Sequence, residues 1–197
     1  MFENLRNFAS CASLRFASAS QQRCLRRSAD CRYDPVVSEP YNEVFEGEVT
    51  RRLAPGERHE AICSRLHSVI KASVANLTST RLLDRRAEVH VADGTTLCPD
   101  LALVTASAGK LWLAVEIVSS DDHRTDTVVK KQIYEDIKVP RLWMIDPRYD
   151  NVEVYHSGEY GLVLKGILAG QEVLTERLLP EFQLAVAELF AGKMPGS

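Results

Sequence analysis

The hydrophobic positions of residues 41–190 follow two periods, which together predict a mixture of strands and helices. Apolar residues three and four positions apart, typical of an amphipathic helix, follow a helix start at Pro55-Gly56-Glu57. A second helix is expected over about residues 125–138, and it must end before Pro140 because proline disfavours helical geometry in the preceding residue. A last short helix is expected at Val186–Phe190. The apolar positions of the first helix are Ile62, Leu66, Val69, Ile70 and Val74.

Shorter runs, either alternating or continuously apolar, predict strands. The segment 106–110 and the turn 157–159 each join two such runs and indicate hairpins. Strands that precede, separate and follow helices indicate one domain of α/β or α+β class, with a mixed β-sheet flanked by helices. The expected strands are residues 88–92, 100–104, 111–118, 142–145, 152–156, 160–164 and 172–175, with a hairpin or turned strand at 43–49.

Composition excludes several classes of protein. The chain has 197 residues, of which 45% are hydrophobic and 26% charged, the mixture of an ordinary globular protein. No apolar run reaches the roughly 18 residues of a membrane-spanning helix, so a membrane protein is not expected. The 5 cysteines are an odd number and form no C-x-x-C pair, which argues against a zinc ribbon or a disulfide scaffold. A reducing compartment fits best, and we expect the cytoplasm.

The composition also divides the chain. Residues 1–39 contain six arginines and four acidic residues, for a charge of +2, whereas the rest of the chain carries −5. This first segment is rich in Ser, Ala and Arg without a sustained period, and we interpret it as a disordered extension, with a transit peptide as the alternative. We expect a folded domain at residues 40–192 and a tail at 193–197.

One charged residue lies where a buried strand is expected. Glu116 interrupts the apolar run Leu111–Val118 and is expected to share a face with Trp112, Ala114 and Val118. A carboxylate in that setting must be paired, protonated or bound to a metal, because an unpaired buried charge is very costly. A functional role is the favoured interpretation, and a buried salt bridge or an exposed edge strand is the alternative.

A second carboxylate begins the preceding strand. Asp100 follows Pro99, and a hairpin could bring its side chain to the same end of the sheet as Glu116. Two converging carboxylates suit a hard cation such as Mg²⁺. An aspartate beside proline is also ordinary turn chemistry, so Asp100 carries weight only together with Glu116.

The helix that follows supplies a possible third group. Asp126, Lys130 and Tyr134 are spaced four residues apart and therefore lie along one face. Lys130 could deliver a positive charge to the two carboxylates. A solvated ion pair between Asp126 and Lys130 is the simpler alternative.

Taken together, these segments resemble the Uma-type restriction endonuclease family, a branch of the PD-(D/E)XK nuclease superfamily. The resemblance covers about residues 41–191, so it spans the whole expected domain. The 39 residues before it are not part of the family pattern. The segments that carry it are Pro99-Asp100, Glu116-Ile117-Val118-Ser119, Asp126-x-x-x-Lys130-x-x-x-Tyr134, Val139–Pro147, Val152–Tyr155, Phe45–Glu48 with His59 upstream, and Glu188–Phe190 at the end.

The resemblance implies a restriction endonuclease-like core with additional C-terminal β-hairpins and a nuclease site. In such a site Asp100, Glu116 and the backbone carbonyl of Ile117 are Mg²⁺ ligands, Mn²⁺ can substitute, and DNA is the substrate. The usual lysine position of the superfamily is Val118 here, and the family pattern moves the lysine to the helix, where Lys130 fits. Tyr134 and Asp126 are expected to support this site.

Several further expectations follow. The chain departs from its relatives at residues 119–122, where two acidic residues would repel a DNA backbone. His59 is expected to be a surface or helix-cap residue, whereas Glu60 could face the cleft. We expect a metal-dependent endonuclease, with a homodimer as a possible assembly. The alternative is an inactive nuclease fold that acts as a nucleic-acid or protein interaction module.

Overall fold

The computed structural model describes residues 39–119 and 124–192. The chain divides into a unit of residues 1–36 and a unit of residues 37–197, and all described residues belong to the second. The expected N-terminal extension, most of the departure at 119–122, and the expected tail therefore lie outside the described residues. Within the described part, no helix combines the length and the apolar character needed to cross a membrane.

A six-stranded mixed sheet forms the centre of the unit. Its strand order is β10-β9-β8-β7-β6-β3, and only the pair β7–β8 is parallel. The parallel pair requires a crossover, and the second helical segment supplies it. The strands are β3 (Thr80–Leu82), β6 (Leu101–Thr105), β7 (Leu111–Ile117), β8 (Arg141–Asp146), β9 (Asn151–Gly158) and β10 (Gly161–Ala169).

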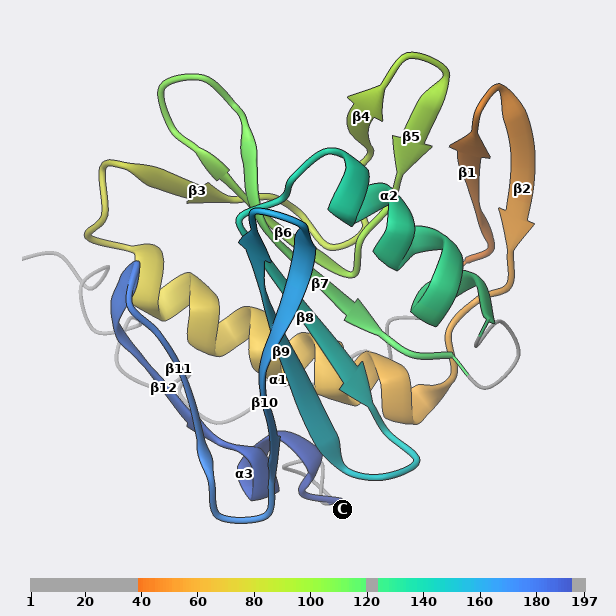
Figure 1. Cartoon of the computed structure of the whole chain (residues 1–197). Coiled ribbons are helices and arrows are strands. Elements are labelled where there is room, and N and C mark those ends of the chain that lie inside the picture. Colours follow the sequence, from red (N-terminus) through yellow and green to blue (C-terminus); the bar gives the residue numbers. More distant parts are fainter. Residues whose placement is uncertain (1–38, 120–123, 193–197) are drawn as a thin grey trace, which may run out of the picture. The chain divides into compact units, whose positions relative to one another are not determined.

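Helices cover both faces of this sheet (Figure 1). The helix α1 (Glu57–Val74) packs its apolar stripe on one face, where it meets alternate residues of β6, β7 and β8. The second helical segment begins as a π-helix, η1 (Thr125–Lys130), and continues as α2 (Lys131–Asp136) against the other face. Because both faces are covered, all seven residues of β7 are buried.

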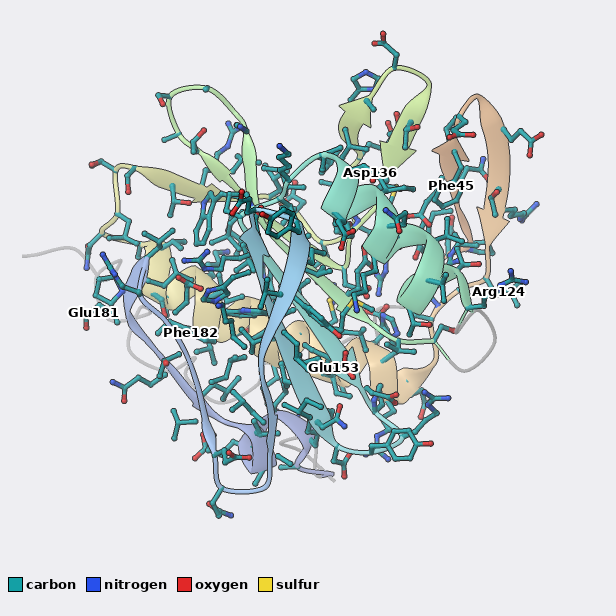
Figure 2. The ribbon with its side chains drawn as sticks, in the orientation of Figure 1. Phe45, Arg124, Asp136, Glu153, Glu181 and Phe182 are labelled. Carbon is teal, nitrogen blue, oxygen red and sulfur yellow. The ribbon has the colours of Figure 1, made fainter. Side chains whose placement is uncertain are left out.

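Two smaller sheets flank the centre. One has the order β2-β1-β5-β4, and the other pairs β11 with β12. Phe182 of β12, labelled in Figure 2, stacks on Trp143 of β8 with ring centroids 5.3 Å apart, which joins the C-terminal hairpin to the core. The remaining bounds are β1 (Tyr41–Phe45), β2 (Glu48–Arg52), β4 (Val89–Ala92), β5 (Thr95–Leu97), β11 (Val173–Glu176), β12 (Leu179–Ala185) and α3 (Val186–Phe190).

The predicted class, a mixed α+β domain, is confirmed, and so are the three predicted helices. The short strands β3, β5 and β12 were not predicted. Trp112 is a further correction, because it packs with Leu113 on the α1 face and not beside Glu116. A bulge in the β6–β7 pairing, between Leu103↔Leu113 and Val104↔Leu111, breaks the alternation on which that prediction rested.

Candidate active site

Asp100, just before β6, lies next to Glu116 on the neighbouring strand β7. Leu101 pairs with Val115 in the antiparallel β6–β7 ladder. Asp100, which precedes Leu101, therefore lies beside Glu116, which follows Val115. Both side chains are almost fully buried, 3% exposed for Asp100 and 2% for Glu116. The predicted convergence of these two carboxylates is therefore present in the fold.

Groups from several segments hold Asp100 in place. Its Oδ2 accepts a hydrogen bond of 2.8 Å from the backbone N–H of Ile117, and its Oδ1 accepts one of 2.7 Å from Nε2 of His59. The Nε of Arg86 lies 3.3 Å from the same Oδ1. Burial alone would raise the pKa of Asp100, but the charge and hydrogen bond of His59, the charge of Arg86 and the Ile117 N–H lower it below its ordinary value. Asp100 is thus kept as an anion.

Glu116 is held from the other side by the second helical segment. The Nζ of Lys130 lies 3.0 Å from Oε2, and the hydroxyl of Tyr134 donates a hydrogen bond of 2.6 Å to Oε1. Burial and the neighbouring Glu116 raise the pKa of Tyr134 well above its ordinary value, so the hydroxyl keeps its proton. Lys130 is itself fully buried, which excludes the solvated ion pair that the helical spacing alone allowed.

A third carboxylate, which the sequence did not indicate, belongs to the same cluster. Glu43 of β1 is 0% exposed, and its Oε1 lies 2.9 Å from Nζ of Lys130. The same oxygen accepts a hydrogen bond of 2.8 Å from the backbone N–H of Cys98, and Arg52 forms an ion pair with Oε2. Polar residues of a short hairpin are usually expected to face solvent. No local pattern indicates that Glu43 contacts Lys130, which lies 87 positions further along the chain.

The three residues predicted to bind the metal line one small cavity. Its lining includes Asp100, Glu116, Ile117 and His59, and the volume open to the centre of a water molecule is ≈ 20 Å³. One water or ion needs about 10–15 Å³ on this measure, so the cavity has room for one water molecule or one ion. The rest of the lining is Tyr41, Arg52, Leu53, Pro55 and Ser119.

The donor set of this cavity fits a hard cation. Asp100 and Glu116 offer carboxylate oxygens, which Mg²⁺ prefers, and each ionised carboxylate has more lone pairs than the contacts described above use. Among the described residues, no three side chains of His, Cys, Asp or Glu form a metal-binding group. A metal here would therefore need further oxygens, and the backbone carbonyl of Ile117, water and substrate phosphate are of the right kind.

The other predicted residues lie at different distances from the cavity. His59 lines it and contacts Asp100, with its side chain 12% exposed, so the surface or cap prediction was wrong. Glu60, one residue on, points to Arg85 and Arg86 and is not part of the cavity lining. The side chain of Asp126 lies outside the described residues, and its supporting role stays a prediction.

Arg86 links Glu60 to the site. It contacts Glu60 as well as Asp100, and its backbone has φ of 54°, a left-handed conformation uncommon for residues other than glycine. Its backbone N–H also donates to the carbonyl oxygen of Asp100 at 3.3 Å. Strain of this kind persists where the surroundings enforce it, often at functional sites.

A larger hollow of ≈ 680 Å³ lies between β1 and the second helical segment. Phe45 and Asp136, both labelled in Figure 2, belong to its two sides. Its charged lining residues are Glu46, Glu48 and Asp136, and no Lys or Arg of the described chain lines it. The hollow therefore lacks the positive charge that would attract a DNA backbone.

Comparisons with known proteins agree with this fold. The chain is similar to the crystal structure of a putative nuclease belonging to DUF820 from Anabaena variabilis, with a TM-score of 0.65 and 20% sequence identity. The match covers 79% of this chain and 92% of the other, and at that identity it shows a shared fold. A search of curated proteins finds no match.

Family membership rests on the sequence match. The Uma2 family, described as "Putative restriction endonuclease", matches residues 32–187, well over half of the chain. This span contains both carboxylates, the buried lysine and every strand of the central sheet. The chain belongs to the Uma2 family of putative restriction endonucleases.

Proposed function

We propose that this protein is a Mg²⁺-dependent endonuclease that hydrolyses DNA phosphodiester bonds at the cavity between Asp100 and Glu116. One observation carries the proposal: two buried carboxylates line one cavity while a buried lysine lies 3.0 Å from one of them. Buried charges of this kind are costly to maintain, and such arrangements cluster at functional sites. Family membership and the shared nuclease fold support the same reaction class.

Each residue has a distinct task in the proposed reaction. Asp100, Glu116 and the carbonyl of Ile117 would hold the cation, which when bound lowers the pKa of a water and polarises the phosphate. His59 and the Ile117 N–H fix the orientation of the Asp100 carboxylate. Lys130 is not part of the cavity lining, and from its place beside Glu116 its charge would offset the negative charge that develops on the phosphate.

The test is cleavage of supercoiled plasmid and of single-stranded circular DNA by the full chain, with Mg²⁺, with Mn²⁺ and with EDTA. Cleavage is expected with either cation and not with EDTA. Glu116→Gln keeps the side-chain shape and removes the charge, and we expect its rate to fall roughly 100-fold or more. Lys130→Met is expected to fall by a similar factor.

A matched control guards against a purely structural loss. Glu176 is also buried, at 6% exposure, and pairs with Arg141 away from the cavity lining. Glu176→Gln is therefore expected to cleave at the wild-type rate. Equal rates for wild type and Glu116→Gln would contradict the proposal, because they would assign any cleavage to a contaminant or another site.

A second candidate function is an inactive nuclease fold that serves as a binding module. The specific observation in its favour is that Asp100 and Glu116 already have cationic partners within the protein, Arg86 and Lys130. A site satisfied in this way is stable without a metal. DNA binding by wild type and Glu116→Gln with equal affinity, and no cleavage by either, would favour this module.

A further inference from the structure

Glu43 is a charged residue of the cluster for which the proposed reaction has no task. It lies on β1, a strand outside the central sheet, and is 0% exposed. Its position is well defined, because the backbone N–H of Cys98 donates a hydrogen bond of 2.8 Å to Oε1 and Arg52 lies 3.5 Å from Oε2. The carboxylate is thus fixed by two groups, of which Arg52 lines the cavity and Cys98 does not.

Lys130 lies between two carboxylates at nearly equal distances. Its Nζ is 2.9 Å from Oε1 of Glu43 and 3.0 Å from Oε2 of Glu116. The ammonium is therefore located by two points on different sheets, one on β1 and one on β7. A lysine has a long flexible stem, and a single partner would leave its position less well determined.

The two carboxylates differ in what a bound cation would do to them. Glu116 lines the cavity, so a metal there would share its negative charge and weaken its attraction for Lys130. Glu43 is not part of the cavity lining and would keep its full attraction. Without Glu43, the ammonium would lose the one of these two carboxylate partners that a cation in the cavity leaves unchanged.

We propose that Glu43 is a positioning residue that keeps the Lys130 ammonium at the site when Glu116 binds the metal. This inference rests on the proposed function and deepens it, because it assigns a group on β1 to a reaction whose other groups lie on the central sheet and its helices. A purely structural ion pair would not require this arrangement, since apolar residues of similar volume often replace buried pairs without loss of stability.

The test compares four forms of the full chain: wild type, Glu43→Gln, Lys130→Met and the double variant. Glu43→Gln keeps an oxygen that accepts from Cys98 and Lys130 but removes the charge. Cleavage kinetics give kcat and KM, and titration calorimetry with Mn²⁺ gives a binding constant that does not depend on activity. Glu176→Gln serves again as the control that removes a buried, paired carboxylate elsewhere.

For Glu43→Gln we expect kcat to fall roughly 10- to 100-fold, the Kd for Mn²⁺ to rise several-fold, and KM for DNA to stay the same. In the Lys130→Met background the same substitution is expected to change kcat by less than about 3-fold, because its effect acts through the lysine. Equal losses with and without Lys130, or a wild-type kcat and Kd for Glu43→Gln, would overturn the inference.

The two proposals fail in different ways. If wild type shows no cleavage that depends on Glu116, the proposed function fails, and the Mn²⁺ titrations alone decide the role of Glu43. An effect on the Kd that vanishes without Lys130 then supports the inference, and an equal effect or none overturns it. Should Glu43→Gln not fold, Glu43→Asp keeps the charge at a shorter reach, and a wild-type kcat for that variant rejects the positioning role.

Discussion

The charges buried around the cavity are matched residue by residue. Glu43 and Glu116 share Lys130, and Asp100 contacts Arg86 and His59. This matching matters because an uncompensated charge in the interior costs several kcal/mol, whereas a hydrogen-bonded pair largely cancels that cost. Removal of any single partner should therefore lower the free energy of unfolding. The size of the decrease depends on how deeply the remaining group is buried.

Tyr134 offers a clean measure of this dependence. Tyr134→Phe removes only the hydroxyl that donates to Oε1 of Glu116, at a fully buried site. We expect the free energy of unfolding to fall by about 1–3 kcal/mol, because a buried carboxylate oxygen loses its donor. Urea unfolding measures it. Tyr155→Phe, which removes a comparable 2.6 Å bond to the half-buried Glu153, should cost less, and equal costs would contradict the argument.

His59 tests how far the orientation of Asp100 matters to the proposed metal site. His59→Ala removes the 2.7 Å hydrogen bond to Oδ1 and leaves the Asp100 carboxylate less constrained. Because groups that orient metal ligands typically contribute 10- to 100-fold to affinity, we expect Mn²⁺ binding to weaken by roughly that factor. Titration calorimetry measures the Kd. An unchanged Kd would mean that Arg86 and the Ile117 N–H hold Asp100 without help from His59.

Residue by residue, the sequence predicted those groups whose local pattern was unusual. Glu116 stood out because a charge inside an apolar run needs an explanation, and Lys130 and Tyr134 followed from helical spacing. Glu43 and His59 did not stand out, since a glutamate in a hairpin and a histidine in a first helical turn both read as surface residues. Their burial depends on contacts between segments far apart in the chain, Glu43 with Cys98 and Lys130, and His59 with Asp100.

At the scale of elements, strong periodic patterns were predicted well and short or irregular ones were not. The apolar stripe of α1 and the continuous apolar runs of β6 to β8 correspond to elements with close to the predicted bounds. The strand β3 has three residues, one of them an arginine, and β12 contains Pro180, so neither has a strand-like pattern. Such strands form because a neighbour offers a ladder to pair with, which is a tertiary effect.

The turn between β9 and β10 shows how an element's packing can depend on one glycine. Gly161 has φ of +127°, and a Cβ there would lie 2.6 Å from the carboxyl carbon of Glu135 on α2. That carboxylate is the end of a flexible side chain, and moving it away would break the hydrogen bond that it accepts from the backbone N–H of Leu162. The hairpin therefore contacts α2 through a position that only glycine fits without strain.

Gly161→Ala is accordingly expected to destabilise the protein by about 1–3 kcal/mol in urea unfolding, from backbone strain and the displaced Glu135. Gly166→Ala in the same strand is the control, because its φ is not positive and the nearest atom to the added Cβ is 3.9 Å away. We expect that variant to stay within about 1 kcal/mol of wild type. Equal stability of the two variants would show that the contact with Glu135 yields without cost.

At the scale of the whole molecule, most of the buried charged residues of the described chain lie around one small cavity. Residues 40–197 carry a net charge of −5, so a general attraction for DNA is not expected, and a local field at the cavity must serve instead. A cation bound between Asp100 and Glu116 would reverse part of that local charge. The proposed function therefore depends on cation binding at this cavity. This binding can be measured without DNA.

A ligand that binds the folded state and not the unfolded state raises stability with the logarithm of its concentration. With a Kd of about 1 mM, 10 mM Mg²⁺ would add roughly 1.4 kcal/mol, or about 3–6 °C in Tm for a chain of this size. We expect this rise for wild type in a thermal scan against NaCl of equal ionic strength, and its absence in the double variant Asp100→Asn, Glu116→Gln. The quantity compared is the shift that Mg²⁺ causes within each protein, so a lower starting Tm of the variant does not affect it. A shift of equal size in both proteins would place the cation elsewhere and remove the basis of the proposed site, whereas a shift confined to wild type would identify these two carboxylates as its ligands.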